Sequence, residues 1–315
     1  MNHEPAPTTE PQFELVPPPT PVARPRARRT DDPFLLPPGN VQVSFSGGRT
    51  SALMLHGLIE RNGVDAMRSD RVKVVFANTG LEHEATLQFV AECERRWGVP
   101  VHWVEFTAGA NGVGYRETSV ATASRRGEPM EKLVEWKRWY LPNIVESFCS
   151  VELKIRTAKR FLMDRGWRSW TTMVGIRADE SHRCRETRRE RSLPRYPLVG
   201  AGICKRDVGA FWDDQPFRLG LPVVNGSVPL GNCVDCFKKS EAFLAGRIRD
   251  GGDGVEDMDR IEARAAEVRG DDARFSKRFS RAEMRRFIET QPDAFDWLRR
   301  TGSLCQADDG ECTDG

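Results

Sequence analysis

Two groups of residues in this sequence have types and spacings that could support chemistry, and the first is a segment rich in small and hydroxyl side chains. Its members are Ser46, Gly47, Gly48, Arg49, Thr50 and Ser51. Glycine lets a backbone approach a phosphate closely, and hydroxyl groups add hydrogen-bond donors. The start of the helical pattern that follows offers unpaired N–H groups to an anion. The segment therefore predicts a phosphate-binding loop, although it lacks both the Gly-Lys-Ser/Thr ending of a Walker loop and the third glycine of a dinucleotide fingerprint.

The second group is a pair of cysteines, Cys233 and Cys236. Their Cys-x-x-Cys spacing suits two thiolates that bind one metal ion or cluster. The chain has eight cysteines and no apolar signal segment near its start, which favours reduced ligand thiols over a disulfide framework. Three alternatives stay open: a cubane iron–sulfur cluster, which we favour, a structural zinc ion, and redox-active or unliganded thiols.

The elements that must position these groups alternate between strand and helix patterns. β-branched apolar runs predict strands, and apolar residues spaced by three and four predict helices. The expected order is strand 41–45, helix 50–61, strand 72–77, helix 84–97, strand 101–106, helices 131–146 and 151–165, strands 170–175 and 196–199, and helix 205–213. This order predicts an α/β fold with a parallel twisted sheet and flanking helices.

The sequence divides into three expected parts. Residues 1–38 are Pro-rich with a short basic cluster and predict a disordered tail. Residues 39–200 hold the α/β nucleotide-binding domain, within which residues 107–129 predict a long loop. Residues 201–315 form a C-terminal extension that carries the cysteine pair and two charged helices, at 255–269 and 281–299.

The pattern Ser-Gly-Gly-x-Thr-Ser directly after the first strand resembles the signature of the PP-loop ATP-pyrophosphatase superfamily. The segment after the second strand, Asn-Thr-Gly-Leu-Glu-His-Glu-Ala-Thr, is similar to the Asp-Thr-Gly…Glu-Thr segment of phosphoadenosine phosphosulfate (PAPS) reductases. The resemblance spans about residues 41–239 and is strongest to a phage and bacterial subgroup. It implies a Rossmann-like three-layer fold, with Thr79, Gly80 and Glu84 near an adenine nucleotide.

Two further motifs resemble the same family. Residues 175–183 are similar to its Gly-x-Arg…Asp/Glu-Ser…Arg segment, which implies that Arg177 and Arg183 bind phosphate or sulfate oxygens through their planar forks. Residues 149–154 are similar to its Cys-x-x-x-Leu-Lys segment, which implies Lys154 as a phosphate ligand. Lys154 and Arg177 are also the expected catalytic groups. The alternative interpretations are a solvated charged loop for the arginines and a solvent-facing helix residue for the lysine.

The resemblance also bears on the cysteines. Relatives that carry a 4Fe-4S cluster pair distant cysteines with a later Cys-x-x-Cys, which implies Cys149 as a third ligand. The candidates for the fourth ligand are Cys312 and Cys305, followed by Cys204 and Cys184. The Glu-Cys-Thr-Asp ending resembles endings in the phage-type subgroup and favours Cys312. Two departures stand out. Ser150 follows Cys149 where relatives usually have adjacent cysteines, and the Cys-Gly-Leu-His segment of assimilatory reductases is missing, which argues against a direct transfer of their mechanism.

Two function classes remain open. In the first, the protein is an enzyme that binds ATP or a PAPS-like nucleotide and either reduces an adenylyl sulfate or adenylates a substrate for sulfur transfer. Mg²⁺ is expected in the adenylating case, and an electron donor or sulfur carrier is the expected partner. In the second, it is a non-catalytic, nucleotide-dependent module that binds nucleic acid. The 39% apolar and 30% charged composition and the short apolar runs predict a cytoplasmic protein with no membrane partner.

Overall fold

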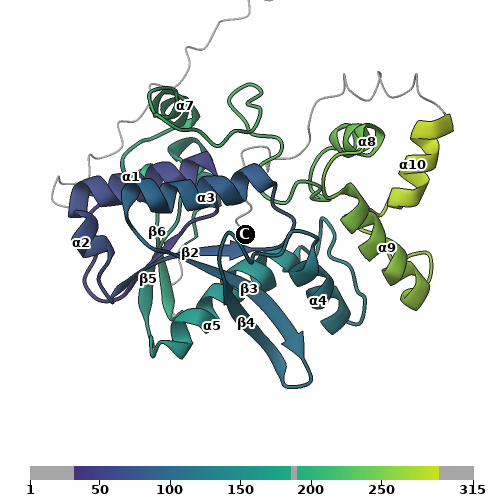
Figure 1. Cartoon of the computed structure of the whole chain (residues 1–315), viewed down its shortest axis with the longest axis horizontal. Helices are drawn as coiled ribbons and strands as arrows, with labels where there is room; N and C mark the ends of the chain where they lie inside the picture. The colour runs from purple at the N-terminus through teal and green to yellow at the C-terminus, as the bar shows by residue number, and fades with distance from the viewer. Residues whose placement is uncertain (1–31, 186–189, 291–315) are drawn as a thin grey trace, which may run out of the picture. The chain divides into compact units, whose positions relative to one another are not determined.

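The computed structural model describes residues 32–185 and 190–290 of the chain. Within them, a six-stranded sheet has the order β4-β3-β2-β1-β5-β6, and neighbouring strands are parallel except for β3 and β4 (Figure 1). The predicted α/β fold is confirmed, with β4 as an antiparallel edge. The strands are β1 (Val41–Ser44), β2 (Val72–Asn78), β3 (Val101–Gly109), β4 (Gly112–Thr118), β5 (Trp170–Met173) and β6 (Ser192–Arg195).

Helices cross over between the parallel strands, largely as predicted. The α-helices are α1 (Arg49–Asn62), α2 (Val64–Met67), α3 (Glu84–Trp97), α4 (Glu128–Trp136), α5 (Thr157–Asp164), α6 (Pro197–Gly200), α7 (Lys205–Asp213), α8 (Glu241–Asp250), α9 (Val255–Arg269) and α10 (Arg281–Thr290). A π-helix (Ser150–Arg156) leads into α5, and a 3₁₀-helix (Ala178–Arg183) follows β5.

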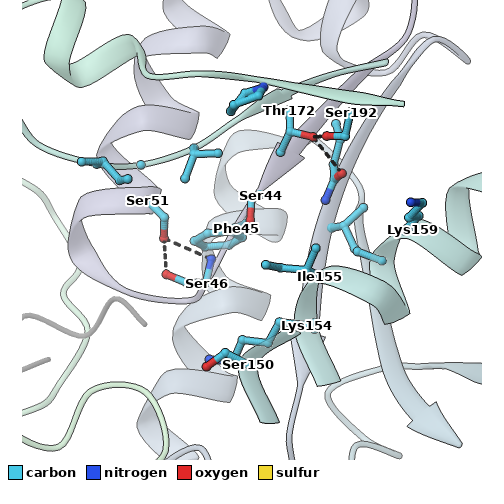
Figure 2. A pocket seen from close by; sticks show the side chains of 18 of the residues that line it. Ser44, Phe45, Ser46, Ser51, Ser150, Lys154, Ile155, Lys159, Thr172 and Ser192 are labelled. Atoms are coloured by element: carbon cyan, nitrogen blue, oxygen red, sulfur yellow. Dashed lines mark hydrogen bonds between the residues drawn. The ribbon is translucent and has the colours of Figure 1, made fainter. Parts of the chain in front are cut away.

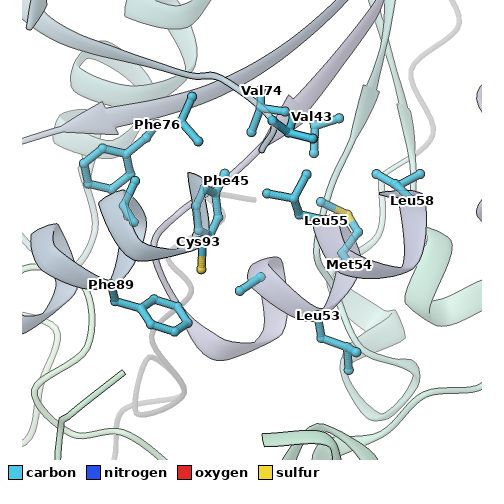
Figure 3. Packing of buried hydrophobic residues seen from close by; sticks show 14 of the residues in the cluster. Val43, Phe45, Leu53, Met54, Leu55, Leu58, Val74, Phe76, Phe89 and Cys93 are labelled. Atoms are coloured by element: carbon cyan, nitrogen blue, oxygen red, sulfur yellow. The ribbon is translucent and has the colours of Figure 1, made fainter. Parts of the chain in front are cut away.

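The two faces of the sheet are buried by different helices. Val43 and Phe45 point to the face that packs under α1 and α3, where Phe76 of β2 joins them (Figure 3). On the other face, Val75 packs with Phe161 of α5. Because successive side chains of a strand point to opposite faces, Gln42 and Ser44 of β1 lie on the α5 side.

Two predicted segments differ from the structure because of local backbone geometry. The helix predicted for 131–146 is wrong in its second half, since α4 ends at Trp136. Arg138 and Trp139 then adopt left-handed φ values of 55° and 62°, which a helix cannot contain. The chain therefore leaves the axis of α4 after Trp136.

Two further predictions are wrong in secondary-structure type. The loop predicted for 107–129 contains β4, which pairs with β3 along its whole length; its glycines hid the strand pattern. The strand predicted for 196–199 is the short helix α6, because Pro197 occupies the first helical position, where its missing N–H costs nothing. The strand lies just before it, as β6.

The described residues from Pro33 onward belong to one compact unit. Met258 and Ile261 of α9 pack with Leu81 and Met130 in a second core cluster, so the C-terminal helices bury apolar surface against the α/β part. No helix in residues 32–185 and 190–290 is long and apolar enough to span a membrane.

Some predictions fall on residues outside the described ranges. Of the tail predicted for 1–38, residues 1–31 lie outside them, whereas Leu36 donates its N–H to Asn62 of α1 at 3.1 Å. The predicted helix 281–299 is described only as far as Thr290, and Cys312 lies beyond it.

Candidate functional site

The conformation of the phosphate loop, residues 46–51, is fixed in part by hydrogen bonds of its own hydroxyl groups. The Ser46 Oγ and Ser51 Oγ atoms lie 2.8 Å apart, and Ser51 Oγ also accepts the Ser46 N–H and donates to the Gly48 carbonyl at 3.1 Å (Figure 2). Gly47 has a φ of 78°, and a Cβ there would meet Thr86 Cγ2 at 2.8 Å. Glycine is therefore required at this position both by its backbone conformation and by the packing of α3 against it.

A cavity of about 540 Å³, here called the large cavity, extends from this loop along the α5 face of the sheet. Its volume lies within the ordinary range for small-molecule sites. Among the described residues that line it, five are cationic and one, Glu190, is a carboxylate, which favours an anionic occupant. The cationic residues are Lys154, Arg156, Lys159, Arg183 and Arg185.

The wall of the large cavity away from the loop is an ordered polar network. Gln42 Oε1 accepts hydrogen bonds from Trp170 Nε1 at 3.0 Å and from Thr172 Oγ1 at 3.2 Å. Thr172 Oγ1 lies 2.5 Å from Ser192 Oγ (Figure 2). These contacts fix the Gln42 carboxamide with its oxygen occupied, so the wall presents defined polar groups rather than an apolar surface.

The structure brings four of the predicted nucleotide ligands to the large cavity: Ser46, Ser51, Lys154 and Arg183. The other residues of the phosphate loop lie behind it. Thr50 is buried, and burial lowers the pKa of Arg49, whose side chain reaches Gly209 of α7. The loop therefore presents hydroxyl groups to the cavity and keeps its arginine against the helix layer.

Two other predicted residues, Arg177 and Glu84, do not line the large cavity. Arg177 is buried and forms ion pairs with Asp179 and Glu180, at 3.1 and 3.5 Å. Glu84 is half-exposed, and its hydrogen bond to the Arg125 guanidinium lowers its pKa. Glu84 does not cap α3 either, because the His83 side chain accepts the Ala85 N–H.

A second cavity, of about 30 Å³ and here called the thiol cavity, gathers three of the predicted cysteine ligands. Cys149 comes from the chain before the π-helix, and Cys233 and Cys236 come from the C-terminal extension. Thr79, predicted to lie near a nucleotide, lines this cavity and stands 3.3 Å from Cys233 Sγ. Thr79 therefore lies beside the thiols and does not line the large cavity. Gly80, the next residue, packs against Gly127 and Pro129.

The Cys-x-x-Cys loop is fixed by buried charges. The Lys239 ammonium donates to the carbonyls of Pro229, Gly231 and Val234 at 2.6, 3.2 and 3.1 Å. In the segment bridged to Cys233, the buried Glu82 carboxylate accepts from the Thr79 N–H and hydroxyl. Buried ions with full hydrogen bonding restrict a loop to one conformation, so both segments are preorganised.

The two cavities share a wall. Ser150 and Lys154 line both of them, and both residues lie on the π-helix. A π-turn shifts the helical register locally and is frequent at functional sites. Lys154 therefore stands between the phosphate loop and the cysteines, which connects the two groups first recognised in the sequence.

The donor set of the thiol cavity suits a soft metal centre in its chemistry. Three thiols from two segments line one small space, and thiolates are the preferred ligands of iron–sulfur clusters and zinc. The side chain of Asn232, beside Cys233, is buried with neither polar atom hydrogen-bonded within the described ranges. No group of three His, Cys, Asp or Glu side chains is arranged to hold a metal ion in residues 32–185 and 190–290. A closed ligand shell would need further approach of the thiols and a fourth donor.

Sequence reasoning missed the polar wall and the buried ions. Gln42 offered a signal, since a polar residue in a central parallel strand departs from the usual apolar run. Ser192 and Thr172 gave no comparable signal. Lys239 could not be found, because its role depends on three carbonyls that only the folded loop brings together.

Comparison with known proteins places this architecture. Residues 40–193 match the model of the phosphoadenosine phosphosulfate reductase domain. The uncharacterized nin region protein ORF290 of Escherichia phage lambda is 32% identical over 63% of this chain and 66% of its own length. An uncharacterized protein of Methanocaldococcus jannaschii is 29% identical over 45% of this chain and 23% of its own length. The chain thus spans slightly less than two thirds of the phage relative and about a quarter of the archaeal one.

Two solved structures show a limited likeness to the chain. Phosphoadenylyl-sulfate reductase from Candida auris, in a phosphate complex, gives a TM-score of 0.35 at 14% identity, over 56% of this chain and 72% of its own. The U34-tRNA thiolase NcsA from Methanococcus maripaludis, with its [4Fe-4S] cluster, gives 0.35 at 12% identity, over 88% and 76%. The sequence match, rather than these likenesses, bears on the family: residues 40–193 are similar to the phosphoadenosine phosphosulfate reductase domain.

Proposed function

We propose that the protein binds an adenine nucleotide in the large cavity and performs nucleotide-activated sulfur chemistry at the thiol cavity. The observation that carries this proposal is the shared wall: Ser150 and Lys154 line both cavities. Lys154 would therefore lie between a group attached to the nucleotide's phosphate and the thiols. A PAPS reductase domain is consistent with an adenine nucleotide as the occupant.

The residues of the large cavity divide the work of binding between its two ends. The phosphate loop supplies hydroxyls and the start of α1 to the phosphates. Arg183 supplies a planar guanidinium for phosphate or sulfate oxygens. Its Nη1 donates to Glu180 Oε1 at 2.6 Å, which orients the guanidinium. Lys154 stabilises the negative charge that develops at the reacting group, in a site that is partly shielded from water.

Cys149, Cys233 and Cys236 would hold a metal centre in the thiol cavity, with Cys312 as the proposed fourth ligand. A 4Fe-4S cluster there would supply electrons or a site that binds sulfur. The chain's own contribution is to fix the thiols through Lys239 and the Glu82–Thr79 pair. Mg²⁺ would accompany the nucleotide in an adenylating reaction.

One experiment separates the two reactions and the non-catalytic alternative. Anaerobically purified protein is incubated with PAPS and a dithiol reductant, or with ATP, Mg²⁺ and candidate acceptors. Sulfite release supports reduction, and pyrophosphate release supports adenylation before sulfur transfer. Nucleotide binding by calorimetry without either product would leave a binding module, and absence of nucleotide binding would overturn the proposal.

The metal proposal has its own test and matched control. We expect purified protein to show the visible absorbance of an iron–sulfur cluster, and we expect Cys233→Ala to lose it together with bound iron and sulfide. Cys204→Ser is the control, because Cys204 caps α7 with Asp207 and serine is also a good cap. Colourless protein with one equivalent of zinc would replace the cluster with a zinc site.

A further inference from the structure

A third surface, separate from both cavities, combines exposed aromatic rings with cationic side chains. It is a groove of about 440 Å³ between the segment that follows α4 and the loop that joins α9 to α10. Among the described residues, Arg269, Arg274, Lys277 and the carboxylate of Asp272 line it, and the carboxylates of Glu283 and Glu146 contact the lining residues Arg274 and Tyr140. We propose that this groove binds single-stranded nucleic acid, with the cations on the phosphates and the rings on the bases.

The charge of the groove suits a polyanion. Lys277 is exposed, and Arg274 lies 3.6 Å from Asp272 and 3.4 Å from Glu283, distances at which ion pairs are weak in water. Arg269 donates one hydrogen bond, from Nη1 to the Arg138 carbonyl at 3.3 Å. A phosphate backbone can therefore replace weak partners at several points at once.

The aromatic side chains have the arrangement of a stacking platform. Tyr140 stacks on Phe148, with ring centroids 5.9 Å apart and planes 21° from parallel, and the Arg269 guanidinium lies 5.6 Å from the Tyr140 ring. Trp136, which is not among the residues that line the groove, is 42% exposed and has Lys137 over its ring at 4.8 Å. Base stacking on such rings, aided by cations, is the sequence-tolerant way in which proteins hold unpaired strands.

The backbone holds this platform in a costly conformation. Arg138 and Trp139 have left-handed φ values, which are unfavourable for side chains with a Cβ. The Trp139 N–H, bonded to the Val134 carbonyl at 2.7 Å, stabilises the turn. Strain of this kind concentrates where function requires a particular presentation, and here it turns the chain so that Tyr140 lines the groove.

The groove and the thiol cavity rest on one apolar cluster. Leu141 and Ala273 from the groove belong to the same core cluster as Cys149 and Cys233. Tyr140 also stacks on Phe148, the residue that precedes Cys149 in the sequence. The groove and the thiol cavity therefore border the same apolar cluster, although no described residue lines both.

The test measures binding of the full-length protein to fluorescent 12-nucleotide oligo-U and oligo-dT strands by anisotropy. We expect Tyr140→Ala and Lys277→Glu each to weaken binding about tenfold. Tyr140→Phe should bind like the parent protein, because it keeps the ring and loses only the hydroxyl bond to Glu146. Arg168→Glu is the matched charge control, since Arg168 is exposed and lies outside the groove.

The outcomes decide the proposal independently of the nucleotide chemistry. The ATP affinity measured by calorimetry should be equal in the parent protein and both groove variants. If none of the three proteins binds ATP, the result counts against the large cavity as a nucleotide site and leaves the groove proposal standing. Preference for oligo-U or for oligo-dT identifies RNA or DNA as the partner, and either supports the proposal. Equal binding of a duplex, equal loss in Arg168→Glu, or no oligonucleotide binding at low salt would overturn it.

Discussion

The large cavity and the thiol cavity share a wall but are assembled in different ways. The hydroxyl hydrogen bonds of the phosphate loop join residues no more than five positions apart, such as Ser46 with Ser51, although α3 and α7 also pack against the loop. The thiol cavity is built from segments that are far apart in the sequence, with Thr79 meeting Cys233 across 154 positions. Local contacts re-form whenever the strand and helix form, whereas distant contacts need the complete fold.

Substitutions in the two cavities should therefore have different effects. A substitution in the phosphate loop should weaken ligand binding and leave the fold intact. A fault in the thiol cavity should loosen the C-terminal extension, because Lys239 ties several carbonyls of that loop together. Lys154 belongs to both cavities, and its loss should interrupt their cooperation without disturbing either assembly.

The largest effect is expected at this shared wall. Lys154→Gln should lower turnover about 10²- to 10³-fold, because it removes the charge that stabilises the reacting group. Nucleotide affinity should fall much less, since the phosphate loop and Arg183 remain. Single-turnover kinetics alongside calorimetry separate the two quantities.

Lys159→Gln is the matched control for that prediction. Lys159 lines the large cavity a little over one turn further along but is not among the residues that line the thiol cavity. It should weaken nucleotide binding without a comparable loss of turnover. Equal losses of turnover in the two variants would mean that the cavities act independently.

The next largest effect concerns the thiol cavity alone. Lys239→Met should lower the free energy of unfolding by about 2 kcal/mol, because three buried carbonyls lose their donor while the desolvation cost of the ammonium is also removed. Urea unfolding measures the change, and the accessibility of the thiols to an alkylating reagent should rise. Lys132→Met on the exposed face of α4 serves as the control. A nucleotide affinity that fell as far as the stability would contradict the separate assembly of the two cavities.

The contrast between local and distant assembly also explains which features the sequence could predict. The phosphate loop, α1 and α3 follow from residue types and spacing within short windows. That Cys149 would face Cys233 came only from a family resemblance, because no local pattern encodes an approach between such distant positions. The position of Thr79 beside the thiols also depends on the fold. The Asn-Thr-Gly pattern predicts a turn, but it does not predict which part of the protein the turn contacts.

The errors in secondary structure have the same origin. The end of α4 at Trp136 is set by a turn at Arg138 and Trp139, two residues with no intrinsic preference for a left-handed backbone. Tertiary packing of the segment around Leu141 must supply the free energy for this turn. A propensity argument over 131–146 contains no information about that packing.

A smaller effect is expected within the phosphate loop. Ser51→Ala should weaken nucleotide binding by about 1 kcal/mol, or roughly fivefold in Kd, because Ser46 loses the partner that holds the loop open. The thiol cavity and the cluster absorbance should not change. Thr50→Val is the control, since Thr50 is buried in the same loop and does not line the cavity. Loss of the cluster in Ser51→Ala would show that the loop and the thiols fold as one unit.

The smallest effect should touch neither cavity. His102 lies on β3 against the Phe161 ring, and burial, with the nearby charges of Lys73 and Arg165, lowers its pKa to about 4. The unfolded chain binds this proton more readily, near the ordinary histidine pKa of about 6.5. Stability from this group is therefore complete above pH 6.5 and falls as the pH drops toward 4. Since His102 is partly exposed and screened, the loss between pH 7 and 5 should be under about 1 kcal/mol. His102→Gln should flatten that part of the unfolding profile, whereas exposed His182→Gln should not. A pH-dependent loss that followed nucleotide affinity instead of global unfolding would place the sensitive group in the large cavity and not on β3.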